Sequence, residues 1–202
     1  MIKRLSVILL LFISVQTFSQ NLDVRILNTI NTSQTQSADK FFKFASNSNN
    51  AVIVGIPLGM GIAGLINHDE KLFNNACFIV EASAVNVALT YALKYSINRE
   101  RPFDKYSYIL KKSDGGGPSF PSGHTSGAFA TATSLSMAYP KWYIIVPSFA
   151  WAGTVAYSRM YLGVHYPSDV LGGMITGAGS AYLSNKLNKW INKHYNKKYV
   201  QY

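Results

Sequence analysis

Five long segments of this chain are apolar and almost free of charge, and they limit the possible fold more than any other feature. Only 14% of the residues are charged and 48% are hydrophobic, which excludes a mostly disordered chain because there is ample apolar surface to bury. The segments are long for strands, and four prolines fall between them or at their edges: Pro102, Pro121, Pro140 and Pro167. We therefore expect helices at residues 51–66, 72–97, 125–139, 142–157 and 170–183.

Residues 21–50 precede these segments; they are polar, with weak helical periodicity, and could add a further helix. The sequence thus predicts an all-α bundle of about five to six helices. As helices, the shorter segments reach only about 22–25 Å, against a hydrocarbon core of about 30 Å. We expect a membrane-embedded bundle with short loops at one end, and the core of a soluble bundle is the alternative.

The N-terminus has the pattern of an export signal. Lys3 and Arg4 precede an apolar run over residues 5–18, and small residues follow it. The run of about 14 residues is shorter than the ~20 that a membrane span needs. We expect residues 1–19 to be a signal peptide cleaved near Ser19, or else an uncleaved anchor, and residues 20–202 to form one helical domain.

The distribution of basic residues bears on topology and on partners. The net charge of +10 fits nucleic acid, anionic lipid or a phosphorylated substrate. If the leader crosses outward and each segment then crosses in turn, the C-terminal lysines lie inside, as the positive-inside rule prefers. Residues 98–124 and 158–169 then lie outside. We expect a cell-envelope protein of the inner membrane with these two stretches facing the periplasm; a soluble periplasmic protein is the alternative.

Polar residues of the kinds used in catalysis fall into three clusters, and the first is a pair of cations. Lys94 and Arg101 are seven residues apart, so they share one face of a helix that persists that far. Pro102 biases Arg101 towards the end of that helix. Two fixed cations suit a doubly charged anion. The alternative is a helix end whose basic side chains reach a membrane surface.

The second cluster is Pro121-Ser122-Gly123-His124, just before an expected helix. Ser122 can cap the helix, and Gly123 lets a ligand approach the backbone closely. Free N–H groups at a helix N-terminus attract phosphate, and His124 would then face the bound group. A plain serine cap with a surface histidine is the alternative.

The third cluster is Ser158-Arg159, followed by His165 and Asp169. Arg159 is a third cation. His165 and Asp169 are four residues apart, a spacing that allows contact on a helical turn. A carboxylate on one imidazole nitrogen makes the other a better nucleophile or base. Alternatively, Asp169 only complements the dipole of a helix that starts near Pro167.

Together the clusters supply three cations, two imidazoles and a carboxylate, which is what metal-free phosphoryl transfer to histidine needs. The sequence has no HExxH motif and no acidic cluster, and its single cysteine, Cys77, excludes an internal disulfide and a cysteine-based zinc site. We therefore expect no metal and no cofactor. These residues alone do not identify the nucleophile, although the carboxylate four residues on favours His165.

The clusters resemble the signature of the type-2 phosphatidic acid phosphatase family, which is related to the vanadium haloperoxidases. The family pattern is Lys-x6-Arg-Pro, then Pro-Ser-Gly-His, then Ser-Arg-x5-His-x3-Asp, and residues 94–169 match it without a gap or substitution. The matching residues are Lys94, Arg101, Pro102, Pro121, Ser122, Gly123, His124, Ser158, Arg159, His165 and Asp169. The resemblance implies a bacterial exported or membrane member whose catalytic loops lie at one end of a helical domain.

The resemblance also implies a mechanism. His165 would attack phosphorus and form a phosphohistidine, Asp169 would orient His165, and His124 would protonate the leaving oxygen. The phosphate oxygens would be held by Lys94, Arg101, Arg159, the Ser122 hydroxyl and the Gly123 N–H. Orthovanadate should then inhibit as a mimic of pentacoordinate phosphorus.

The loop over residues 103–120 suggests the substrate class. It is basic and aromatic and contains the flexible run 115–117, which suits an amphiphilic phosphate at a membrane surface. We expect a lipid phosphate or diphosphate: phosphatidate, phosphatidylglycerol phosphate, an isoprenoid diphosphate or a lipid A phosphate. The same loop could equally be an ordinary solvated one.

Other functions stay open at this point. An exported phosphatase of broad specificity would act on soluble phosphomonoesters. Haloperoxidase chemistry with bound vanadate has only analogy to support it. A non-catalytic module that binds anionic lipid or nucleic acid would need an unbroken basic stripe, whereas here the charge is split, so we expect no nucleic-acid partner. A non-catalytic membrane scaffold would not need the full set of motif residues.

Overall fold

The computed structural model describes residues 22–32 and 35–199, with side chains described as far as residue 190. The described part of the chain is helical and contains no strand, which confirms the all-α prediction. A helix over residues 22–32 comes before α2 (Gln36–Ile66), α3 (Glu70–Ile97), α4 (Pro102–Lys105), α5 (Gly123–Ala138), α6 (Trp142–Tyr161) and α7 (Pro167–Tyr199). The leader expected at residues 1–19 lies outside the described residues.

The helix ends follow from local side chains. Thr35 caps α2 by accepting the Ala38 N–H at 3.2 Å, and Asp69 caps α3 by accepting the Leu72 N–H at 2.9 Å. Helix α3 ends at Asn98, which has the left-handed φ of 47° that asparagine tolerates. Arg101 therefore lies beyond α3, as the N-cap of α4 with an extended backbone before Pro102, rather than at the end of the helix that carries Lys94.

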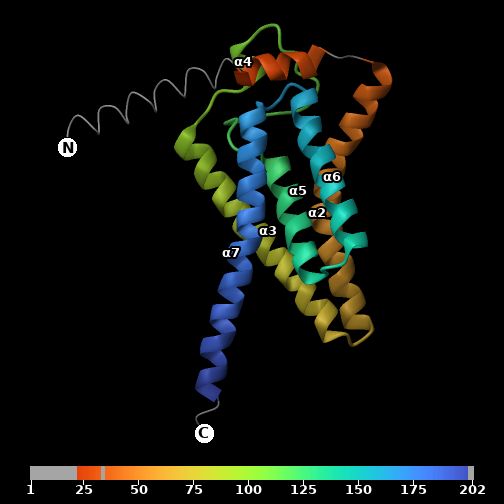
Figure 1. Ribbon diagram of the computed structural model, residues 1–202, viewed down its shortest axis with the longest axis vertical. Helices are drawn as coiled ribbons and strands as arrows, with labels where there is room; N and C mark the ends of the chain where they lie inside the picture. The colour runs from red at the N-terminus through yellow and green to blue at the C-terminus, as the bar shows by residue number, and fades with distance from the viewer. Residues whose placement is uncertain (1–21, 33–34, 200–202) are drawn as a thin grey trace, which may run out of the picture.

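Helix α5 lies in the middle of the bundle, between the other long helices (Figure 1). It packs most closely on α7, where a Cβ at Gly173 would stand 2.8 Å from the Ser122 carbonyl oxygen. A Cβ at Gly177 would stand only 2.1 Å from the Ser126 carbonyl oxygen. Glycine is therefore required along this α5–α7 seam, because any side chain would push the two backbones apart.

Gly177→Ala should lower the stability of the protein by about 1–3 kcal/mol, since the new methyl group has no room. Thermal unfolding of the purified protein in detergent measures the effect. Gly179→Ala is the matched control, because Gly179 lies two residues along the same helix with nothing within 4 Å of its Cβ position. Equal midpoints for the two variants would contradict the tight seam.

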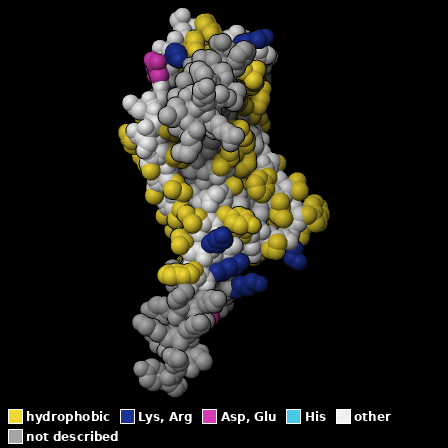
Figure 2. Space-filling model, turned by 60° about the vertical axis from the view of Figure 1, so that its left-hand side comes forward, with side chains coloured by type: hydrophobic (Ala, Val, Ile, Leu, Met, Phe, Trp, Pro, Cys, Tyr) yellow, Lys and Arg dark blue, Asp and Glu magenta, His cyan; other side chains and the backbone are white. Residues whose placement is uncertain are grey.

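The surface and the interior have the polarity of a membrane protein. Two described helical stretches, Gln36–Ile66 and Glu70–Lys105, are long and apolar enough to cross a membrane. Apolar side chains such as Leu58 and Val80 point outward, whereas small polar side chains such as Ser126 and Ser134 are buried. Figure 2 shows hydrophobic side chains over the flank of the bundle and basic ones towards its two ends. The expected orientation needs all five segments to cross and stays a prediction.

Candidate active site

The structure brings the three sequence clusters together at one end of the bundle. Arg101 Nη1 lies 3.3 Å from His165 Nε2 and donates to the Val164 carbonyl at 3.0 Å, which joins the first cluster to the third. The carbon chain of Lys94 lies 4.0 Å from the position of a Cβ on Gly123, which joins the first cluster to the second. The predicted convergence of these residues is therefore present.

The two cations of the first cluster are fixed by the loop that follows α4. Lys94, in the last turn of α3, donates to the Pro118 carbonyl at 2.6 Å. Arg101 donates through Nε to the Gly117 carbonyl at 2.9 Å and through Nη2 to the Gly116 carbonyl at 2.8 Å. The glycine run that looked merely flexible in the sequence thus supplies acceptors that hold Arg101 in place.

Arg159 comes from the end of α6 and is 2% exposed. Its Nη1 donates to the Ser46 hydroxyl, and Nη2 donates to the Asp114 carbonyl at 3.3 Å. Its Nε is buried and has no hydrogen-bond partner among the described residues. A buried charged donor without a partner is costly, so this arginine suits an additional anionic ligand.

Ser122 and His124 lie at the N-terminus of α5. The Ser122 oxygen accepts from the Thr125 hydroxyl at 3.0 Å and from its N–H at 3.4 Å, so it caps the helix as predicted. The Ser122 N–H donates to the Asp169 carbonyl at 3.0 Å, which ties the start of α5 to the start of α7. Burial, and then the cations Arg159 and Arg101 together with neighbouring ionisable groups, lower the pKa of His124 to about 3.

His165 and Asp169 are both buried, at 2% and 0% exposure. Their facing atoms, Nδ1 and Oδ2, are 3.5 Å apart, which is longer than a strong hydrogen bond. Burial lowers the pKa of His165 to about 4 against the opposing effect of Asp169. Burial alone would raise the pKa of Asp169, but contacts with His165, Arg99 and Ser119 hold it below its ordinary value. Near neutral pH, His165 is therefore a neutral imidazole beside the ionised carboxylate of Asp169.

A family profile described as the PAP2 superfamily matches residues 75–193, more than half of the chain. The chain belongs to the PAP2 superfamily. The whole motif, from Lys94 to Asp169, lies inside the matched region, and the helical architecture agrees with the membership.

Several PAP2 relatives are similar over parts of their length. A lipid A 4'-phosphatase of Bacteroides thetaiotaomicron is 37% identical over 86 residues, 43% of this chain and 38% of the relative. An undecaprenyl-diphosphatase of Sulfolobus acidocaldarius is 34% identical over 110 residues, 52% of either chain. The crystal structure of Aquifex aeolicus LpxE superposes with a TM-score of 0.69 at 28% identity, covering 82% of this chain and 95% of that one. The match thus spans about half or less of each of these two curated relatives.

Three residues outside the PAP2 motif also belong to the site, and no sequence pattern singled them out. Arg99, Asp23 and Ser119 all belong to one hydrogen-bonded network around Asp169. The sequence indicated Arg99 only weakly, through its position two residues before the motif arginine Arg101. Asp23 had none, because it is 76 residues from Arg99 along the chain and outside the matched region.

Proposed function

We propose that this protein is a metal-independent phosphatase that hydrolyses a lipid phosphate or diphosphate through a phosphohistidine on His165. One observation carries the proposal. Three cations, a second imidazole and a carboxylate lie together around the buried ring of His165. We also place this site on the periplasmic face of the inner membrane, with the C-terminal lysines inside.

The first half of the reaction is an in-line transfer to nitrogen. Asp169 holds the proton on His165 Nδ1, so the lone pair is on Nε2, the nitrogen that attacks the substrate. The Nε2–phosphorus bond forms as the bond from phosphorus to the leaving oxygen breaks, and His124 gives that oxygen a proton. Lys94, Arg101 and Arg159, with the Ser122 hydroxyl and the Gly123 N–H, would meet the charge on the phosphoryl oxygens.

The second half restores the enzyme. Water attacks phosphorus, the phosphorus–nitrogen bond breaks, and His124 takes the proton from the water. His124 must be protonated at the start of each cycle, although burial and then the cations around it lower its pKa in the free enzyme. A phosphoryl dianion between those cations offsets their repulsion and raises the pKa of His124, so binding of the substrate itself prepares the acid.

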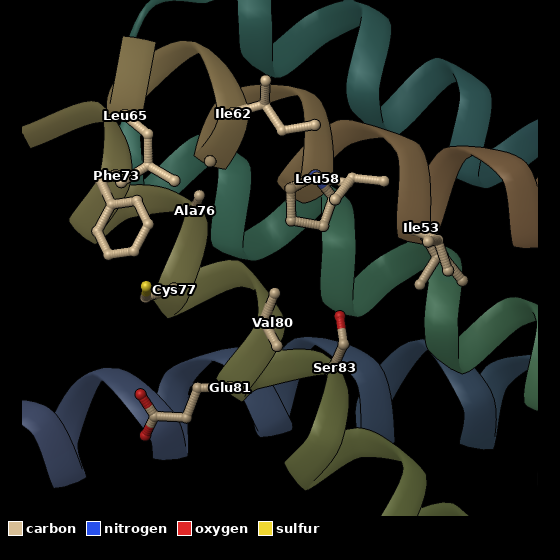
Figure 3. Close-up of a pocket in the computed structure, with 13 residues that line it drawn as sticks. Ile53, Leu58, Ile62, Leu65, Phe73, Ala76, Cys77, Val80, Glu81 and Ser83 are labelled. Atoms are coloured by element: carbon tan, nitrogen blue, oxygen red, sulfur yellow. The ribbon is translucent and has the colours of Figure 1, made fainter. Parts of the chain in front are cut away.

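An apolar groove next to the site supports a lipid substrate. A cavity of about 280 Å³ beside His124 is lined by residues of α2, α3 and α5. It shares Ile53 and Ser83 with a larger apolar groove of about 670 Å³ between α2 and α3, whose lining is drawn in Figure 3. An acyl or prenyl chain could therefore leave the phosphate site without entering water. The names of the lipid A and undecaprenyl relatives support the same class.

Phosphate release from a panel of substrates tests the proposal. The panel contains phosphatidate, phosphatidylglycerol phosphate, undecaprenyl diphosphate, lipid A and soluble para-nitrophenyl phosphate. We expect kcat/KM to be highest for one of the lipids, turnover to survive EDTA, and orthovanadate to inhibit. A preference for the soluble ester would favour the broad-specificity alternative, and turnover lost to EDTA and restored by a metal would contradict the scheme.

A further inference from the structure

We propose that Arg99 and Asp23 are positioning residues that hold the Asp169 carboxylate toward His165. The helix over residues 22–32 then becomes part of the catalytic apparatus, although it lies outside the region that the PAP2 profile matches. This inference rests on the function proposed above, because it assigns the network to the residue that orients the nucleophile.

Both oxygens of the Asp169 carboxylate are held. Oδ1 accepts from Arg99 Nη1 at 2.6 Å. Oδ2 accepts from the Ser119 hydroxyl at 2.5 Å and from the Tyr166 N–H at 2.9 Å. With a donor on each oxygen, the carboxylate cannot rotate about its own bond, and Oδ2 stays on the side of His165 Nδ1.

Arg99 joins this carboxylate to a second one. Its Nη2 donates to Asp23 Oδ2 at 2.8 Å, and its Nη1 also donates to the Ser168 hydroxyl at 2.6 Å. Its Cζ lies 3.9 Å from the centre of the Tyr166 ring, so a cation–π contact also holds the guanidinium in place. A planar fork with two contacts at its tips is a geometry that lysine does not reproduce.

Asp23 also binds the first turn of α7, the helix that contains Asp169. Its Oδ1 accepts the Ser168 N–H at 2.9 Å, and the Ser168 hydroxyl donates to its Oδ2. Ser168 lies in the first turn of α7, immediately before Asp169, so Asp23 caps the helix that presents the catalytic carboxylate. Asp23 is 6% exposed, and its helix is anchored by the fully buried side chain of Leu27.

Loss of the network should act on His165 in two ways. Without Arg99, Asp169 can turn away from His165 Nδ1, and a misplaced orienting group lowers kcat. The charge of Asp169 is then also less compensated, which favours the charged imidazole. The other ionisable groups facing His165 are Arg101, Arg159 and His124, and these remain unchanged.

The test compares variants of the full-length protein on the panel substrate that the wild type turns over best. Arg99→Gln should lower kcat about 10- to 100-fold and leave KM nearly unchanged, because the phosphate-binding cations are intact. The acidic limb of its kcat/KM profile should move to higher pH. Arg99→Lys keeps the charge without the fork, so it should restore the position of that limb and only part of kcat.

Asp23→Asn separates orientation from folding, because the amide oxygen can still accept the Ser168 N–H. It should lower kcat by less than Arg99→Gln, and the double variant should be no worse than Arg99→Gln alone, since both act through one guanidinium. Asp69→Asn, at the cap of α3, and Arg25→Gln, exposed on the helix over residues 22–32, are matched controls that should keep wild-type activity.

The possible failures are distinguishable. If the wild type releases no phosphate from any panel substrate, the proposed function itself fails. If the wild type is active and loses activity in His165→Asn, but Arg99→Gln keeps its kcat and its acidic limb, only the present inference is overturned. It is also overturned if Arg99→Gln loses activity by one factor at every pH together with a lower unfolding midpoint, or if the effects of Asp23→Asn and Arg99→Gln are additive.

Discussion

Replacing His165 by asparagine should reduce phosphate release by about 10⁴-fold or more, because the substitution removes the proposed nucleophile. Asparagine keeps a polar planar group in the buried site, so the protein should stay folded. With a substrate labelled in its phosphate, the wild type should also accumulate a phosphoenzyme that survives alkali and decays in acid, as a phosphoramidate does. His165→Asn should give no such label.

The matched control is His68→Asn. His68 lies in the turn between α2 and α3 at a φ of 54°, which asparagine adopts readily, so this variant makes the same chemical change away from the site. It should keep wild-type turnover. Turnover in His165→Asn within a few-fold of the wild type would remove His165 from the mechanism and leave His124 as the imidazole to examine.

Asp169→Asn should lower kcat by about 10³- to 10⁴-fold, the scale seen when an orienting carboxylate becomes an amide. The amide NH₂ would replace either Oδ2, where it faces His165 Nδ1 and the donors of Ser119 and Tyr166, or Oδ1, where it faces Arg99, and each choice places donors face to face. An NH₂ in place of Oδ2 favours the wrong imidazole tautomer, and one in place of Oδ1 repels Arg99.

This result is measured as kcat with the best panel substrate, alongside the thermal unfolding midpoint. Asp104→Asn is the matched control, because Asp104 is an exposed first-turn aspartate of α4 near the site. Activity in Asp169→Asn near that of the control would mean that His165 does not depend on the carboxylate. A parallel loss in both variants would point to a general effect of charge at this end of the bundle.

Much of the site could be predicted because its residues stand at short, fixed spacings. The pairs Lys94 with Arg101 and His165 with Asp169 are local, and a proline or a helix start fixes the backbone beside each. The convergence of the clusters could be expected only through the family resemblance, since no local pattern brings residue 101 next to residue 165.

The supporting network could not be predicted in this way. Asp23 and Ser119 meet Arg99 and Asp169 across 76 and 50 residues, and neither stands in a patterned segment. The helical periodicity was also too weak to divide residues 21–50, where the structure has a separate helix over 22–32 and the first half of α2. Pro57 lies inside α2, so proline alone does not mark every helix end.

The contact between α5 and α7 at Gly173 and Gly177 has a consequence for how such a molecule can diversify. The helix starts that carry His124 and Asp169 are in contact through their backbones, with no side chain between them. The distance between the two helices therefore cannot change without loss of this packing. Between α2 and α3 a comparable restriction lies near the turn that joins them, where a Cβ at Gly64 would stand 2.8 Å from the Phe73 backbone nitrogen, whereas at Gly61, in the groove, the nearest atom is 3.8 Å away. Under the proposed function, related proteins with other lipid preferences should therefore differ in the side chains that line the α2–α3 groove. The distance between α5 and α7 should be the same in all of them.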